Sequence, residues 1–348
     1  MREVRKRLGS SVTFYAGAHQ LDPSVKTSID ASLYTPTGTR LIARRFLLQT
    51  GHIAVTLRAD TAILDLNPRN LTVWPLLVIR RVLRRRTLLW GHLHPRAGAS
   101  SKTAILRRTM RRLANGTILY GYDSVLQARL EVSNSPVWVA PNSLHPARDL
   151  GASRRDRHPR ILCVGRLVAS KKVDLLVRAF AASELHSSGI ILTVVGEGAE
   201  LQRLQLLSQE LDVGGQVEFV GQVSEPSALI ELYADALCSV SAGYVGLSLT
   251  QSLGFGVPML VSRDELHSPE IELERFGGVT YFQSDSVISL ADALRAVERT
   301  VDQRNRQELG AAIKRTYSAE SMAEGLIRAL ENRAQDLGED GWPLSQRI

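Results

Sequence analysis

The chain has 348 residues, of which 44% are hydrophobic and 22% charged, which suffices for two domains of ordinary size with a core each. No apolar run reaches the roughly 20 residues of a membrane-spanning helix, and no apolar segment follows the charged N-terminus as in a secretory signal. Two cysteines, Cys163 and Cys238, lie in apolar stretches that favour packing, so a disulfide framework is not implied. We expect a cytoplasmic protein.

Charge is divided unevenly along the chain. Residues 1–150 contain 23 Lys and Arg against 8 Asp and Glu, a net charge of +15. The remaining residues contain 20 and 27, a net charge of −7. This asymmetry predicts that the two halves bind different partners.

The first half alternates short apolar runs with helical patterns. Strands are expected at residues 12–16, 62–66, 87–90, 116–120 and 137–140, with helices at 72–83 and 103–113. Residues 143–158 are polar and rich in Arg, Asp, Pro and Gly, and we predict a linker there.

The second half shows the βα alternation more clearly. Strands are expected at residues 160–164, 190–195, 217–220, 236–240 and 258–261, and helices at 173–182, 199–211, 226–234, 250–255 and 287–300. This pattern predicts a doubly wound parallel sheet, in which ligands bind beyond the carboxyl ends of the strands. We therefore expect an α/β protein of two Rossmann-like lobes, 1–150 and 151–330, with a tail at 331–348, and chemistry in the cleft between the lobes.

The segment VGRLVASKKVDLLVRAF joins the first strand of the second lobe to a helix. It places Gly165 and Arg166 at the strand end and Lys171 and Lys172 at the helix start. Cations beside unbonded helix N–H groups bind a diphosphate strongly. The alternative is a surface loop with solvated charges.

Two further turns carry glycine at a strand end. VVGEGAEL places Gly196 and Gly198 around Glu197, which by itself is a weak signal. SAGYVGLSLTQ has a loop from Gly243 to Gly246 before a helix, whose first amides favour an anionic ligand.

These three elements, in this order and spacing, resemble family 4 of the retaining glycosyltransferases, which have the GT-B fold. The resemblance covers about residues 160 to 300. It implies that Arg166 and Lys171 grip the pyrophosphate of a nucleotide diphosphate-sugar, and it places Lys172 where the family usually has glycine. That donor is a substrate, so the resemblance implies neither a cofactor nor a metal ion. The resemblance also implies that residues 1–150 form the acceptor-side lobe and residues 151–330 the nucleotide-sugar-binding lobe.

The sequence departs from the family at two positions. The family commonly carries two glutamates eight residues apart, and here Gly243 and Gln251 stand in their places. A glutamine amide can still bond to a ribose diol, and backbone amides of the V-G-L loop, typical of a subgroup, would anchor the phosphates. The expected donor-binding residues are Gly165, Gly196, Glu197, Gly243, Val245, Gly246, Leu247 and Gln251. The segment His267–Pro269–Glu270 resembles part of a family subset, and Glu270 receives no role.

The first lobe resembles the same subgroup through LDLNPRNLTVW and LLWGHLHPRAG. The resemblance points to His92 as a donor-sugar or acceptor contact, with a structural histidine as the alternative and His94 as a competitor. Asn142 is expected to form a hydrogen bond between the lobes, and Tyr120 to pack. The segment VTFYAG resembles one that usually follows a first βα unit, so we expect this lobe to lack that unit.

Arginines cluster in two places, at residues 80–86 and 107–112. Residues three and four apart share a helix face, so each cluster predicts a basic stripe. A solvated face, nucleic-acid binding and contact with anionic lipid are the alternatives. We favour lipid, because no nucleic-acid-binding module or interleaved aromatic residues accompany the arginines.

The sequence therefore predicts a retaining, metal-independent glycosyltransferase, peripheral at the inner face of the membrane, with a lipid-linked glycan of cell-surface polysaccharide synthesis as its acceptor. The alternative is a non-catalytic GT-B homologue that binds nucleotide-sugar or a partner protein. No nucleic-acid partner is expected.

Overall fold

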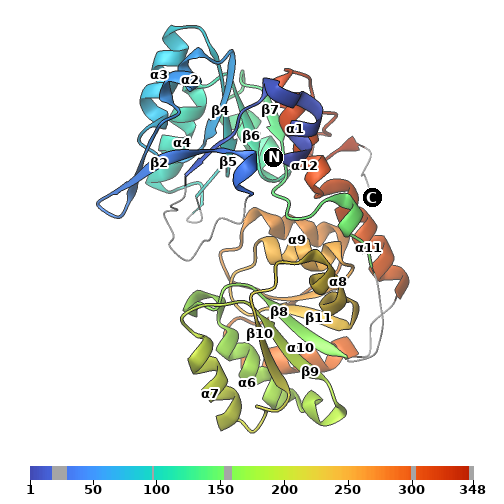
Figure 1. Cartoon of the computed structure of the whole chain (residues 1–348). Helices are drawn as coiled ribbons and strands as arrows, with labels where there is room; N and C mark the ends of the chain where they lie inside the picture. Colours follow the sequence, from blue (N-terminus) through green and yellow to red (C-terminus); the bar gives the residue numbers. More distant parts are fainter. Residues whose placement is uncertain (18–29, 96–97, 153–158, 299–302, 345–348) are drawn as a thin grey trace. The chain divides into compact units, whose positions relative to one another are not determined.

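The computed structural model describes residues 1–17, 30–95, 98–152, 159–298 and 303–344 (Figure 1). They form two compact units, which we call the N-lobe (Met1–Asn142 with Ala319–Ile348) and the C-lobe (Ser143–Ser318). Three sequence predictions extend beyond the described residues: the linker at 153–158, the helix at 299–300 and the tail at 345–348.

A parallel four-stranded sheet, in the order β4-β5-β6-β7, forms the centre of the N-lobe. Its strands are β4 (Thr61–Asp65), β5 (Arg86–Gly91), β6 (Gly116–Leu119) and β7 (Val137–Val139), and the connecting helices are α3 (Val73–Val82), α4 (Lys102–Leu113) and α5 (Ser124–Glu131). Successive strands are neighbours and such crossovers are right-handed, so the three helices cover one face. The four strands and helices α3 and α4 confirm the sequence prediction.

Alternating side chains of β5 divide the N-lobe core between the two faces of this sheet. Leu89 packs in a cluster with residues of α3 and α4, including Leu76 and Met110. Leu88 packs on the opposite face with residues of helix α12 (Ala319–Leu330), including Leu326.

A three-stranded sheet precedes this core. Strand β1 (Tyr15–Gly17) pairs parallel with β2 (Thr35–Ile42), and β2 pairs antiparallel with β3 (Phe46–Thr50). Residues 1–14 contain helix α1 (Arg2–Leu8) and no strand, and α2 (Ile53–Arg58) follows β3. The β2–β3 hairpin was not predicted, because most residues of β2 are exposed and give no apolar pattern.

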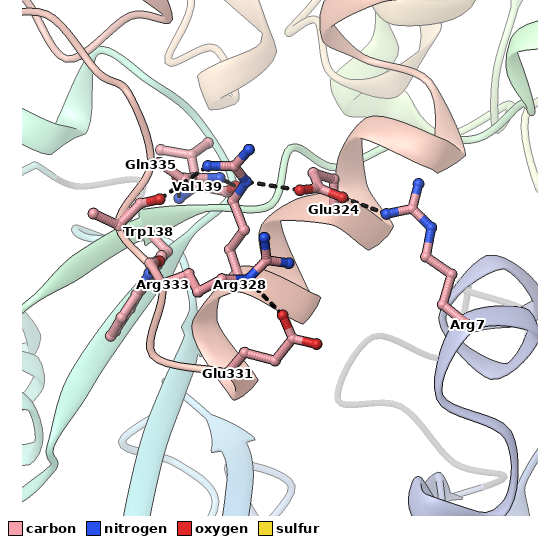
Figure 2. Close-up of polar contacts among 9 residues, drawn as sticks. Arg7, Trp138, Val139, Glu324, Arg328, Glu331, Arg333 and Gln335 are labelled. Carbon is pink, nitrogen blue, oxygen red and sulfur yellow. Dashed lines mark hydrogen bonds and ion pairs between the residues drawn. The ribbon is translucent and has the colours of Figure 1, made fainter.

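The C-terminal segment is fastened to the N-lobe, which corrects its assignment to the second lobe and a tail (Figure 2). The Trp138 indole donates to the Arg333 carbonyl at 2.7 Å, and the Gln335 amide bonds to both backbone groups of Val139. Arg7 of α1 forms an ion pair with Glu324 of α12. Helix α12 joins this lobe because its apolar face is buried against the sheet and helix α1.

The C-lobe contains a six-stranded parallel sheet in the order β10-β9-β8-β11-β12-β13. The strands are β8 (Arg160–Val164), β9 (Ile191–Val195), β10 (Val217–Gly221), β11 (Ala236–Ser241), β12 (Met259–Ser262) and β13 (Val279–Phe282), and the helices are α6 (Val173–Ser183), α7 (Leu201–Glu210), α8 (Pro226–Ala234), α9 (Leu247–Gly254), α10 (Val287–Glu298) and α11 (Gln303–Thr316). Strand order reverses between β8 and β11, which makes their carboxyl ends the expected ligand site of a doubly wound sheet. Strand β13 and helix α11 were not predicted.

Both cysteines are buried and free, in agreement with their predicted packing role. Cys163 of β8 and Cys238 of β11 lie in the same apolar cluster, with side chains of α6 and α10. Leu162 points to the other face and packs near Phe255.

The start of the predicted linker is part of the C-lobe. Leu150 is buried, and the Gly151 amide donates to the Gly254 carbonyl at 3.0 Å. The boundary therefore falls at 142/143, not at 150/151, because residues 143–152 pack on helix α9. In the described part of the chain, no helix is long and apolar enough to cross a membrane.

Candidate functional site

The loop after β8 carries the two predicted diphosphate-binding cations to the strand-order reversal. Arg166 lies two residues after the end of β8, and Lys171 ends the short 3-10 turn Ala169–Lys171 before α6. Both bond to Tyr244, which lies in the loop after the neighbouring strand β11. The Arg166 Nη2 donates to the Tyr244 hydroxyl at 2.9 Å, and the Lys171 Nζ donates to the Tyr244 carbonyl at 2.7 Å. The structure thus brings the two cations to one residue.

Lys172 belongs to a different cluster. Its ammonium contacts carboxylate oxygens of Glu265 and Asp285, each at 2.6 Å. Its φ of 49° lies in the left-handed region that favours glycine, which fits the glycine that the resemblance implies at this position.

The glycines after β8 and β9 allow two loops to pack closely. A Cβ on Gly196 would lie 1.9 Å from the Gly165 carbonyl oxygen, and one on Gly198 would lie 2.1 Å from that of Leu167. The Glu197 carbonyl accepts from the Leu167 amide at 2.9 Å, while its side chain is exposed. Gly196 therefore has a packing role, and donor contact by Gly165, Gly196 and Glu197 stays a prediction.

Gly243 has no room for a side chain. A Cβ there would lie 2.2 Å from the Ser170 carbonyl oxygen and 2.9 Å from the Lys171 Cα. The loop after β11 therefore rests directly on the loop after β8, and a carboxylate at 243 would force the two apart.

His267 fixes the next part of this loop. Its Nδ1 accepts from the Val245 amide at 3.1 Å, and its Nε2 donates to the Ser262 carbonyl at 2.8 Å. The Val245 amide therefore has a partner within the protein, and its expected role as a phosphate anchor stays a prediction. The amides at the start of α9, Leu247 among them, have no partner within the helix and keep that role as a prediction.

Gln251 is buried in α9 and held by two side chains. Its Nε2 donates to the Tyr233 hydroxyl at 3.2 Å, and its Oε1 lies 3.3 Å from the His145 Nε2. Both rings pack against Phe255. A ribose contact from Gln251 stays a prediction, and the structure adds a local role in holding the start of the C-lobe. Glu270 is buried at the start of a 3-10 helix (Pro269–Phe276).

In the N-lobe, His92 follows β5 and packs edge-on against Tyr120, with ring centroids 4.8 Å apart. Arg107 of α4 donates to the His92 carbonyl at 2.8 Å. Burial, together with the positive charge of Arg107, lowers the pKa of His92 to about 4. Its imidazole is therefore neutral near pH 7 and suited to hydrogen bonding with a sugar hydroxyl.

The His94 Nε2 lies 3.3 Å from the Glu131 carboxylate, and the choice between His92 and His94 stays a prediction. Tyr120 packs between His92 and Trp90, as predicted. The backbone amide of Asn142 donates to the Tyr120 carbonyl at 3.3 Å within the N-lobe. The predicted hydrogen bond from Asn142 between the lobes stays a prediction.

The arginine clusters do not form the predicted basic stripes. Arg80 and Arg111 are fully buried. Arg86 donates to the carbonyls of Ala329 and Leu330, at the end of α12. Arg81 donates to the Arg112 carbonyl, at the end of α4. Most of these cations bond to backbone carbonyls because such groups at helix ends lack partners.

Solved structures show the same architecture. HepE from Anabaena, crystallised with UDP, aligns with a TM-score of 0.63 at 13% identity, over 80% of this chain and 80% of that one. The lipopolysaccharide outer core galactosyltransferase WaaB aligns with a TM-score of 0.58 at 16% identity, over 81% of this chain and 79% of that one. The chain has the GT-B fold.

Sequence comparisons show that this chain is similar to known glycosyltransferases. Residues 151–311 match the model of the family described as glycosyl transferases group 1. A GDP-mannose-dependent alpha-(1-6)-phosphatidylinositol monomannoside mannosyltransferase of Mycobacterium tuberculosis is 24% identical over 243 residues, 63% of this chain and 62% of that protein. An alpha-monoglucosyldiacylglycerol synthase of Streptococcus pneumoniae is 26% identical over 144 residues, 41% of this chain and 33% of that one. The chain thus matches less than two thirds of the length of these relatives.

Sequence reasoning missed Tyr244 and the role of His267. Tyr244 lies between Gly243 and Gly246, in a loop already expected to face the ligand. A large aromatic side chain in that loop was the signal from which its role could have been predicted. His267 was noticed only as part of a resembling segment.

Proposed function

We propose that this protein is a glycosyltransferase that moves a sugar from a nucleotide diphosphate-sugar to an acceptor hydroxyl. The observation that carries the proposal is the meeting of Arg166 and Lys171 at Tyr244, beside the start of α9, where strand order reverses. Two cations and a helix N-terminus together suit a diphosphate. The match of residues 151–311 to glycosyl transferases group 1 supports the same chemistry.

In the proposed reaction, the bond between the sugar and the nucleoside diphosphate breaks and negative charge develops on the leaving phosphate. Arg166, Lys171 and the amides at the start of α9 stabilise that charge, so no metal ion is required. His92 offers a neutral imidazole to the sugar or the acceptor. Retention of the anomeric configuration is part of the proposal through the resemblance to family 4.

The acceptor we propose is lipid-linked, and the N-lobe rests on an anionic membrane surface. We call the exposed residues Val78, Ile79, Val82, Leu83, Ile105 and Leu106 the α3–α4 face. Val82 is 77% exposed and Ile105 64%. Helices α3 and α4 contain no acidic residue, and Arg84, Lys102 and Arg112 are exposed beside the face. Exposed aliphatic groups flanked by cations suit an anionic lipid surface.

Similar proteins support this choice of acceptor. The name of the mycobacterial relative contains phosphatidylinositol monomannoside, and that of the streptococcal relative contains monoglucosyldiacylglycerol. The membrane contact proposed here differs from the predicted arginine stripe, because aliphatic side chains form its centre.

The second candidate function is nucleotide-sugar binding without catalysis. The tight packing at Gly243 favours it, since no carboxylate fits there. Turnover of a bound donor separates the two candidates, because a sensor would bind the nucleotide-sugar and release it unchanged.

The first test is thermal stabilisation by UDP, GDP, ADP and dTDP. One of these at a hundred times its dissociation constant should stabilise the wild type by about 2.7 kcal/mol. The Arg166→Ala/Lys171→Ala double variant should lose the effect. Lys172→Gln is the matched control and should keep it, because Lys172 pairs with Glu265 and Asp285. The stabilisation should also persist in EDTA.

If no nucleotide stabilises the folded wild type, the proposed activity is wrong. If Lys172→Gln loses the effect as completely as the double variant, the charge of the region matters and the specific pair does not.

A further inference from the structure

Tyr244 contacts both cations of the proposed diphosphate site through three different groups. Its hydroxyl accepts from Arg166 Nη2 at 2.9 Å, and its carbonyl accepts from Lys171 Nζ at 2.7 Å. The same Nζ lies 3.5 Å from the centroid of the Tyr244 ring, well within the range of a cation–π contact. Hydroxyl, carbonyl and ring face therefore all serve these two side chains.

The backbone on both sides of Tyr244 is fixed. Gly243 packs against the Ser170–Lys171 backbone, and the Val245 amide bonds to His267. The Ser241 hydroxyl lies 3.2 Å from the Tyr244 carbonyl and donates to it. The ring is thus placed by a loop docked on the segment that carries the two cations.

Arg166 and Lys171 carry like charges and would repel each other if nothing lay between them. Tyr244 supplies electronegative groups to both but carries no charge of its own. A carboxylate in that position would cancel one positive charge, as Glu265 and Asp285 do for Lys172. A neutral partner adds no negative charge beside a bound diphosphate.

We propose that Tyr244 is the positioning residue that holds Arg166 and Lys171 together as one diphosphate-binding pair. The inference rests on the proposed function, since it concerns the same site. A guanidinium has five N–H donors and an ammonium three, so a bond to Tyr244 from each is compatible with phosphate contacts from both. Tyr244 thereby holds the two cations at a site where Gly243 leaves no room for the glutamate that the resemblance implies.

The test is calorimetric titration with inorganic pyrophosphate and with whichever of UDP, GDP, ADP and dTDP stabilises the wild type. Tyr244→Phe removes the hydroxyl and keeps the ring and the carbonyl, so affinity should fall about threefold to tenfold. Tyr244→Leu also removes the ring and should lower affinity by about tenfold or more. Tyr281→Phe is the matched control, because that tyrosine bonds to Glu274 outside this site, and its affinity should stay unchanged.

A double-mutant cycle separates positioning from general packing. In an Arg166→Ala background the hydroxyl has lost its cation, so Tyr244→Phe should change the affinity much less than in the wild type. In a Lys171→Ala background, removal of the ring by Tyr244→Leu should cost much less than in the wild type. Additive losses in both backgrounds would overturn the proposal.

The outcomes distinguish this inference from the proposed function. A wild type that binds neither pyrophosphate nor any of the four nucleotides overturns both. A wild type that binds, with Tyr244→Phe and Tyr244→Leu binding equally well, overturns the role of Tyr244 alone. Thermal unfolding without ligand checks that each variant is folded, and Tyr244→Phe changes only one oxygen atom.

Discussion

Two buried arginines of the N-lobe share one arrangement. Arg80, near the end of α3, donates from Nε to the Thr87 hydroxyl of the following strand at 2.8 Å. Arg111, near the end of α4, donates to the Thr117 hydroxyl of its following strand at 3.1 Å. Arg80 also bonds to the carbonyls of Thr56 and Ala59, and Arg111 to the Ala128 carbonyl and the Glu131 carboxylate. Both arginines therefore connect a helix to neighbouring segments.

The contacts of Arg80 predict a large stability effect. Its guanidinium also bonds to the carbonyls of Thr56, Ala59 and Arg86, which Arg80→Met would leave buried without that partner. We expect a loss of about 3 kcal/mol or more in the free energy of unfolding. The matched control, Arg84→Met, should stay within about 0.5 kcal/mol because Arg84 is exposed.

Tryptophan fluorescence during urea unfolding measures the free energy of unfolding of the N-lobe, which contains Arg80. The four tryptophans, Trp74, Trp90, Trp138 and Trp342, all belong to the N-lobe. Equal midpoints for Arg80→Met and Arg84→Met would mean that the buried arginine network adds nothing to stability.

At the scale of an element, helix α12 depends on close packing at one glycine. A Cβ on Gly325 would lie 2.0 Å from the Val139 carbonyl oxygen and 2.9 Å from the Ala140 Cα. These are backbone atoms of β7 and the residue after it, which cannot move as a flexible side chain would. The helix can therefore lie on the sheet only because residue 325 has no side chain.

Gly325→Ala should push α12 away from β7 and lower the stability of the N-lobe by about 2 kcal/mol or more. Gly215→Ala is the control, because a Cβ there would meet no atom within 4 Å. Urea unfolding followed by tryptophan fluorescence reports the change. If Gly325→Ala unfolds at the wild-type midpoint, α12 tolerates displacement and its contacts contribute little.

The pattern of the element predictions has a physical cause. Strands such as β8 and β11 were found because they are buried on both faces and form continuous apolar runs. The β2–β3 hairpin is mostly exposed, and α12 shows its apolar face without showing which lobe covers it. The local pattern of apolar residues indicates which side of an element is buried. It does not indicate which other segment of the chain covers that side.

At the scale of the whole molecule, the net charge of +15 in residues 1–150 is divided between structural arginines and an exposed basic surface. We expect the protein to bind vesicles containing phosphatidylglycerol more tightly than vesicles of phosphatidylcholine alone, and less tightly as salt rises. The double variant Val82→Asp/Ile105→Asp should lower the affinity by about tenfold or more, because aliphatic groups of the α3–α4 face enter the interface.

Leu206→Asp is the matched control for this measurement, since Leu206 is a 53% exposed aliphatic residue of the C-lobe. Co-sedimentation with vesicles gives the affinities. Equal binding to neutral and anionic vesicles, or an equal loss in Leu206→Asp, would remove the α3–α4 face as a membrane contact.

The sequence by itself determined the doubly wound C-lobe and the expectation of a diphosphate site at Arg166 and Lys171. Both depend on spacing within short segments, where a strand, a loop and a helix follow one another directly. Tertiary structure alone decided that Arg80 and Arg111 are buried, that α12 joins the N-lobe and that Tyr244 holds Arg166. Arg166 and Tyr244 are 78 residues apart in the chain. A buried charge and a shared partner depend on groups from distant segments, and only the packed fold brings those groups within bonding distance.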